Sequence, residues 1–65
     1  MAVFELAERR QHGLIVRLLW DSERNQVLLR YRDNRTEDAF VADVPNGLAL
    51  EAFRHPNVFR PGLSV

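Results

Sequence analysis

Three segments of the chain alternate between apolar and polar side chains, and this period of two restricts the fold more than any other feature of the sequence. The clearest is VLLRYRD, in which Val27, Leu29 and Tyr31 fall on one side of an extended chain. The segments LIVRLLWD and AFVADV flank it, and the polar connections DSERNQ and DNRTED separate them. Connections this short join neighbouring antiparallel strands, so the pattern predicts a β-meander.

The two ends of the chain complete the predicted fold. The first segment, AVFELAERR, suits either a strand or a short helix, and the QHG turn that follows it favours a strand. Towards the C-terminus, NGLALEAFRH has the spacing of an amphipathic helix, which can cover one face of an antiparallel sheet. We therefore predict a single α+β domain over 1–65, a small four-stranded antiparallel β-meander with one C-terminal helix packed on one face. The expected elements are strands at about 3–9, 14–20, 27–32 and 39–44, a helix at about 47–55 and an extended tail at 57–65.

The predicted helix has recognisable ends and an apolar side. Asn46 follows Pro45 and is a good N-cap, while Pro56 cannot continue a helix and disfavours helical geometry at His55. In the tail, Phe59 is expected to pack against the sheet. The helix and one face of the sheet should together form a core that contains Leu18, Trp20, Leu29, Tyr31, Phe40, Leu50 and Phe53.

The length of 65 residues limits the stability of such a domain. A chain of this size buries only about 60% of the surface that it exposes when unfolded, and small domains usually gain stability from disulfides, metals or self-association. The chain has no cysteine, which excludes disulfides and thiolate metal sites, and its two histidines are too far apart in sequence to predict a zinc site. We therefore expect no metal and no cofactor, and a homodimer or a protein partner is the simplest source of further burial.

The apolar pattern predicts neither a membrane segment nor a secretory leader. The longest apolar runs fall far short of the roughly 20 residues that span a bilayer, and Met1 is not followed by a basic region and an apolar h-region. A chain without cysteine also suits a reducing compartment. The expectation is a cytoplasmic protein with no membrane partner.

Known catalytic motifs are missing from the sequence. There is no G-x-S-x-G, no glycine-rich phosphate loop and no H-E-x-x-H, and the serines are Ser22 in a turn and Ser64 beside the C-terminus. His55 at a helix end suits the helix dipole and lies one turn from Glu51, which explains it without chemistry. A domain of this size also has little room for a pocket of about 300 Å³ or more, the usual size of a ligand site. We expect no catalytic residue, no small-molecule substrate and no enzymatic activity.

The side of the sheet away from the core carries the most informative residues. If the helix covers the face with Trp20 and Tyr31, apolar residues of the other face are left towards solvent among arginines, and such contiguous groups mark interaction sites. Ordinary half-apolar strand surface, with arginine heads paired to Glu5 or Asp43, is the alternative. We favour a protein-interaction or regulatory module that self-associates through this face. The predicted interface consists of Ile15, Arg17, Leu19, Leu28, Arg30, Arg32 and Val41.

Nucleic-acid binding through the same arginines is the second hypothesis. All nine basic residues are arginine and the formal net charge is zero, although an all-arginine inventory can equally reflect a GC-rich genome. Sheets that bind single strands display aromatic side chains for base stacking, whereas Trp20 and Tyr31 alternate onto the core side. Only phosphate contacts would remain, extended by arginines in the turns, namely Arg9, Arg10, Arg24 and Arg35.

From LLWD through VLLRYRD and AFVADVP to LALEAFRHP, the chain resembles a group of small actinobacterial proteins of unassigned function. Such proteins run through W-D, an alternating strand ending in D, and then P-x-x-x-A-L-x-A-F-x-H-P. The matching positions of that last motif are Pro45, Ala49, Leu50, Ala52, Phe53, His55 and Pro56, and Arg54 stands where such proteins often carry an aromatic residue. The resemblance spans residues 18–56 and implies an actinobacterial cytoplasmic protein, a small sheet with one helix that is accessory to regulation, with no catalytic motif.

Overall fold

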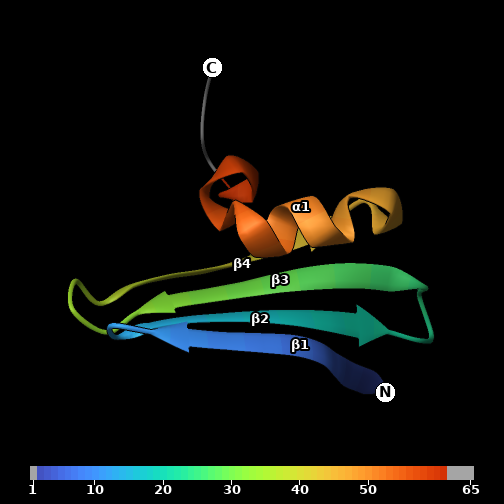
Figure 1. Cartoon of the computed structure of the whole chain (residues 1–65). Helices are drawn as coiled ribbons and strands as arrows, with labels where there is room; N and C mark the ends of the chain where they lie inside the picture. Colours follow the sequence, from blue (N-terminus) through green and yellow to red (C-terminus); the bar gives the residue numbers. More distant parts are fainter. Residues whose placement is uncertain (1, 62–65) are drawn as a thin grey trace.

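One antiparallel sheet and a short helix make up the fold of this chain, for which the computed structural model describes residues 2–61 (Figure 1). The strands lie in sequence order, so the sheet is a meander, and the predicted fold class is confirmed. The strands are β1 (Val3–Gln11), β2 (Leu14–Asp21), β3 (Gln26–Asp33) and β4 (Asp38–Val44). A 3-10 turn η1 (Asn46–Leu48), helix α1 (Ala49–Arg54) and a second 3-10 turn η2 (Pro56–Phe59) follow them. Each strand is one or two residues longer than the alternation predicted.

The turn between β1 and β2 is a tight hairpin. His12 and Gly13 both have positive φ angles, 50° and 83°, as the two central residues of a type I′ turn require. Glycine reaches this region of backbone space without strain. A Cβ added at Gly13 would lie 3.2 Å from Cγ of Arg35, so the lack of a side chain suits this turn as well.

The two longer connections each begin with a buried aspartate. Asp21 Oδ1 accepts a hydrogen bond from the Glu23 amide at 3.1 Å, and Asp33 Oδ1 accepts one from the Arg35 amide at 2.9 Å. Such Asx turns use a short side chain to satisfy the backbone where the strand ends. A side-chain hydrogen bond from Arg35 also holds the pKa of Asp33 below its usual value. These aspartates therefore form turns and are explained without any catalytic role.

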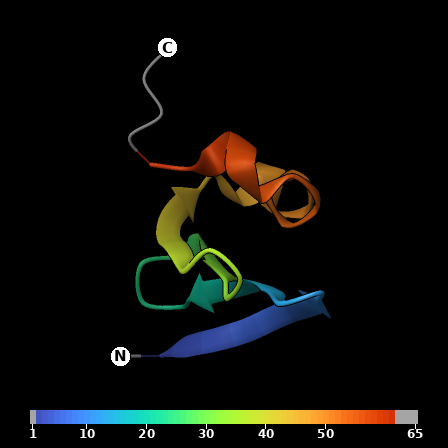
Figure 2. The same ribbon diagram turned by 90° about the vertical axis from the view of Figure 1, so that its left-hand side faces the viewer.

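The core lies between α1 and the face of the sheet that this helix crosses. Helix α1 packs on β2 and β3, while η2 packs on β4. Figure 2 shows that the sheet curves around the helix and that β1 lies farthest from it. Ala52 is fully buried, and its small side chain lets the helix approach the sheet closely. The buried apolar residues of this core are Val16, Leu18, Val27, Leu29, Tyr31, Val44 and Ala52.

The predicted core is found on this face with one exception. Leu18, Leu29 and Tyr31 are buried, and Trp20, Phe40, Phe53 and Phe59 are partly buried against them. Leu50 is 58% exposed, so its assignment to the core is wrong. The helix has only six residues, and its narrow inner side holds Ala49, Ala52 and Phe53 at the i, i+3, i+4 spacing. Leu50 falls outside that inner side.

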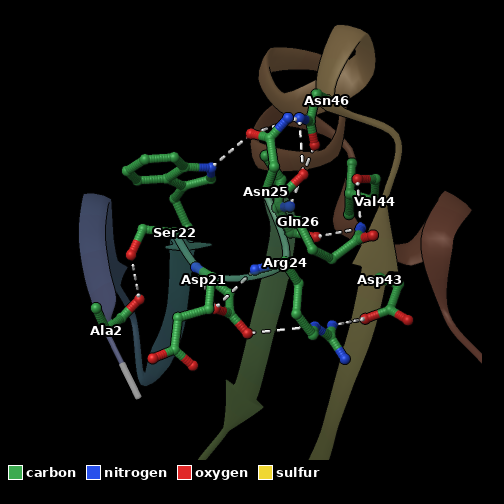
Figure 3. A network of polar contacts seen from close by, with 12 residues as sticks. Ala2, Asp21, Ser22, Arg24, Asn25, Gln26, Asp43, Val44 and Asn46 are labelled. Carbon is green, nitrogen blue, oxygen red and sulfur yellow. Dashed lines mark hydrogen bonds and ion pairs between the residues drawn. The ribbon is translucent and has the colours of Figure 1, made fainter.

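Asn46 does not cap the helix, which corrects the predicted role of this residue. The cap positions of η1 and α1 are Pro45 and Leu48, and neither makes a side-chain cap hydrogen bond. The Asn46 side chain instead accepts a hydrogen bond from the Val27 amide at 3.3 Å. It also donates one to the Asn25 carbonyl at 3.0 Å (Figure 3). It therefore ties the start of the helical segment to the loop between β2 and β3.

Residues 57–59 of the predicted extended tail are not extended, contrary to the prediction, whereas Arg60 has extended backbone angles. Pro56–Phe59 forms a 3-10 turn, and His55 before it leaves the helical region with φ −131° and ψ 66°, as its place before a proline favours. Arg60 then donates to the carboxylate of Asp38 at 3.0 and 2.6 Å, which fastens the segment to β4. The last part of the predicted tail, residues 62–65, lies outside the described residues.

Candidate functional site

The face of the sheet opposite α1 is covered by no other element of residues 2–61, and we call it the open face. The strand register places its residues side by side, since Arg17 of β2 pairs with Arg30 of β3, and Arg30 pairs in turn with Val41 of β4. All members of the predicted interface lie on this face, namely Ile15, Arg17, Leu19, Leu28, Arg30, Arg32 and Val41.

The apolar residues of the open face are shielded to different extents. Ile15, Leu19 and Leu28 are half-buried, whereas Val41 on the edge strand is 55% exposed. Because no helix lies over this side, the shielding comes from neighbouring side chains of the sheet, and arginine stems are long enough to provide it. The open face is therefore a mixed surface of half-covered aliphatic groups and exposed guanidinium heads.

A hollow of 190 Å³ opens on this face and is lined by Ile15, Arg17, Arg30 and Arg32. The Nε atom of Arg17 lies 3.5 Å from a carboxylate oxygen of Glu5, and it is buried without donating a hydrogen bond to any described residue. Arg32 Nε donates to Asn34 Oδ1 at 2.9 Å. Arg30 makes no hydrogen bond or ion pair within residues 2–61. The hollow thus offers guanidinium donors that this part of the chain does not use.

Charge is distributed unevenly along the open face. Near the β1–β2 turn, Arg10 and Arg32 lie on the same rung of the sheet. Four residues further along β2, Leu19 pairs with Glu5 of β1 and with Leu28 of β3. Leu28 pairs in turn with Asp43 of β4, so both outer strands carry an acid at this level of the sheet. The face is therefore basic at one end and acidic at the other.

A β-bulge in β1 brings both acids of that strand onto the open face. The register shifts between Glu5 and Ala7, with Leu6 as the extra residue, so that Glu5 and Glu8 pair with residues of the same side of β2. A side-chain hydrogen bond from Arg10 holds the pKa of Glu8 below its usual value, with Arg17 adding to this effect. The negative charge of Glu8 is thus compensated by arginines of the same chain. The alternation in sequence gives no sign of this bulge.

The negative charge of Asp43, at the far end of the open face, is less fully compensated than that of Glu8. Arg24 Nη2 lies 3.7 Å from Asp43, and Nε of the same guanidinium lies 3.2 Å from Asp21 (Figure 3). One arginine is therefore shared by two acids. The Asp43 side chain is 70% exposed, which leaves it accessible to a further cation.

A second and larger hollow lies on the helix side of the sheet. It is open to solvent, has a volume of 390 Å³ and is lined by Arg9, Leu14, Tyr31, Arg54, His55, Pro56, Asn57 and Val58. The expectation that the domain has little room for a pocket of this size is therefore wrong. Its residues come from four separate stretches of the chain, and no motif links them, so sequence patterns could not reveal it.

Neither a metal site nor a membrane segment is found in the part of the chain that the structure describes. Within residues 2–61, no group of three or more histidine, aspartate or glutamate side chains is placed to hold a metal ion. No helix in the same range is long and apolar enough to cross a membrane.

Comparison with protein-family models, with curated proteins and with solved structures finds no match for this chain. The fold and its surfaces define it as a small α+β meander with one covered and one open sheet face. The resemblance to small actinobacterial proteins stays a prediction.

Proposed function

We propose that this chain is a small non-enzymatic interaction or regulatory module of the cytoplasm that forms a homodimer through the open face of its sheet. The observation that carries the proposal is an arginine without a described partner, Arg30, in a hollow beside exposed aliphatic surface. Arg30 has no partner in residues 2–61, and Val41 beside it is 55% exposed. Burial of the aliphatic groups would supply the association energy, and the charged groups would set the register.

The uneven charge of the open face favours a second copy of the chain as the partner. In an isologous dimer a face meets itself about a two-fold axis. If the axis runs across the strands, the basic end of one face lies opposite the acidic end of the other, so that Arg10 approaches Glu5 of the second copy and Arg32 comes beside Asp43 of the second copy. If the axis ran along the strands, like charges would meet. Charge complementarity therefore supports the first arrangement.

Sedimentation equilibrium tests this proposal with a matched pair of variants. Val41 on the open face and Leu50 on α1 have nearly equal exposure, 55% and 58%, so arginine at either position carries a similar risk to folding. We expect the wild-type chain and Leu50→Arg to sediment at twice the chain mass of 7.6 kDa, and Val41→Arg to sediment as a folded monomer. The wild-type dimer should also weaken as salt rises, because exposed charge pairs are screened.

Two outcomes would contradict the proposal. If the wild-type chain stays monomeric at high protein concentration, the open face is not a self-association interface. A dimer that survives Val41→Arg but is lost in Leu50→Arg would place the interface on the helix side instead.

Binding of nucleic acid is a second candidate, favoured by the same three arginines around the open-face hollow. The described strands place no aromatic side chain on this face, since Trp20 and Tyr31 lie on the helix side. Contact would therefore be limited to phosphates. Affinity for a single-stranded oligonucleotide should then fall steeply with salt, and Arg30→Ala should lower the slope of that dependence by about one unit. Absent or salt-insensitive binding would end this hypothesis.

A further inference from the structure

The larger hollow lies on the side of the sheet away from the proposed dimer interface and has its own chemistry. It is formed where β1, β2 and β3 meet the end of α1 and the start of η2. Its volume of 390 Å³ falls within the range of about 300–1,000 Å³ that small-molecule sites occupy. Whatever binds there need not interfere with association through the open face.

The polar side chains that line this hollow can donate hydrogen bonds, and two of them are positively charged arginines. Arg9 and Arg54 contribute guanidinium groups, and His55 and Asn57 contribute an imidazole and an amide. No aspartate or glutamate is among the lining residues. Arg54 makes no hydrogen bond or ion pair within the described range, 2–61. A hollow with two arginines and no carboxylate is suited to an anion, because guanidinium groups bind carboxylate and phosphate oxygens in a bidentate manner.

Arg9 is oriented by an aromatic contact rather than by an acid. Its guanidinium carbon lies 5.4 Å from the centre of the Phe53 ring, a cation–π distance. No ion pair with an acid of residues 2–61 competes for its donors. The contact fixes the arginine beside the hollow while leaving its hydrogen-bonding capacity free for a ligand.

Tyr31 adds a neutral hydrogen-bond donor to the lining of the hollow. The residue is only 7% exposed, and its ring stacks on Phe40 with the centroids 4.8 Å apart. Its hydroxyl makes no hydrogen bond to any described residue and is not among the fully buried polar atoms, so it stays open to a partner from outside the chain. Because Tyr31 lines the hollow, an oxyanion bound there would satisfy this donor.

The remaining lining residues are apolar and lie around the donors. Leu14 comes from the start of β2, and Pro56 and Val58 come from η2. Pro56 is buried, while Val58 is 73% exposed, which is a large exposure for a valine. These side chains could cover the carbon skeleton of a ligand whose charged group reaches the arginines.

We propose that this hollow binds a small organic oxyanion, a carboxylate or phosphate group carried on an apolar body. Arg9 and Arg54 hold the charged oxygens, the Tyr31 hydroxyl donates to one of them, and Leu14, Pro56 and Val58 contact the apolar body. The shared chemistry is the oxyanion, and the choice between carboxylate and phosphate is left to the test.

Titrations followed by amide chemical shifts test this site directly. The probes are phenyl phosphate, benzoate and inorganic phosphate, each added to the full chain at constant ionic strength. We expect saturable shifts confined to the residues that line the hollow, with phenyl phosphate or benzoate binding more tightly than inorganic phosphate because they carry an apolar body. Whichever of the two aromatic probes binds more tightly identifies the preferred oxyanion.

Three variants separate this site from general attraction of anions to arginine. Arg54→Ala removes an exposed side chain with no described partner, and it should weaken binding by roughly tenfold or more. Tyr31→Phe removes only a hydroxyl and should weaken it by roughly three- to tenfold. Arg30→Ala, on the open face, is the control and should leave binding unchanged.

Equal binding by the wild-type chain, Arg54→Ala and Tyr31→Phe would overturn the proposal, as would the absence of saturable shifts with all of the probes. Loss of binding in Arg30→Ala alone would also overturn it and assign the anion to the open-face hollow. Because Arg54→Ala alters an exposed residue, the test stands even if Tyr31→Phe loosens the core. The oligomeric state measured in parallel keeps a failure of this site distinct from a failure of the proposed dimer.

Discussion

The two faces of this sheet are built from the same strands and yet differ in almost every physical respect. On the covered face, Val16, Leu29 and Val44 are fully buried, and their packing with Ala52 is what the small helix adds. On the open face, the aliphatic residues are half-buried at most, and the nearest neighbours are arginines and acids. The comparison teaches that one helix of six residues is enough to make the two faces of a sheet different, with a core on the covered side and a candidate contact surface on the other.

The largest expected effect comes from truncating adjacent leucines that point to opposite faces. Leu29 is 0% exposed, so Leu29→Ala should cost about 2–5 kcal/mol of unfolding free energy, enough to unfold a marginal domain. Leu28 is half-buried on the open face, and Leu28→Ala should cost about 1 kcal/mol in the monomer. Urea denaturation at low protein concentration measures both. Equal losses would show that the two faces do not differ as described.

The next largest effect is expected on the strength of the dimer, when a charge on the open face is reversed and a charge on the helix side serves as the control. Arg32 and Arg54 are both exposed and make no ion pair with a described acid, but only Arg32 lies on the open face. Arg32→Glu should weaken the dimer by about tenfold or more, because it places an acid opposite the acidic end of the second copy. Arg54→Glu is the matched control and should leave the dimer unchanged. A tighter dimer in Arg32→Glu would instead favour a two-fold axis along the strands.

The ion pair at the edge of the covered face makes a pH-dependent contribution. A side-chain hydrogen bond from Arg60 holds the pKa of Asp38 below its usual value. A carboxyl with a lowered pKa in the folded state stabilises the fold above its unfolded pKa, and that stabilisation is lost as the pH falls through the folded pKa. Asp38→Asn should therefore be less stable than the wild-type chain at neutral pH and converge with it in acid. Thermal melts across pH measure this, and Glu51→Gln, an exposed acid on α1, should run parallel to the wild-type chain.

The smallest expected effect lies in a turn that belongs to neither face. Glu37 has a φ of 59°, a region in which asparagine is tolerated better than glutamate. Glu37→Asn should stabilise the fold by about 0.5–1 kcal/mol and leave the dimer unchanged, as measured by chemical denaturation and sedimentation. Glu37→Gln removes the charge without relieving the backbone, so it should have little effect. If both variants stabilise equally, the gain is electrostatic and not conformational.

The sequence predicted the strands well because the period of two is a local property. Val27, Leu29 and Tyr31 alternate in sequence and therefore lie on one side wherever the strand is placed. The same reasoning failed where a contact between distant segments decided the outcome. Asn46 looked like a helix cap, but its side chain bonds to Asn25 and Val27, which no local pattern shows. The bulge at Leu6 changes which face of the sheet the following residues of β1 point to, and the alternation in sequence gives no sign of it.

The sequence by itself determined the number of strands, the meander and the residues of β2, β3 and β4 that share each face, because backbone geometry alone makes neighbouring side chains of a strand point to opposite sides. The tertiary structure decided where the short helix begins, and so it left Leu50 in solvent and placed Ala52 in the core. It also gathered Arg9, Tyr31 and Arg54 around one hollow. Packing decided these features because they depend on how segments far apart in the chain approach one another.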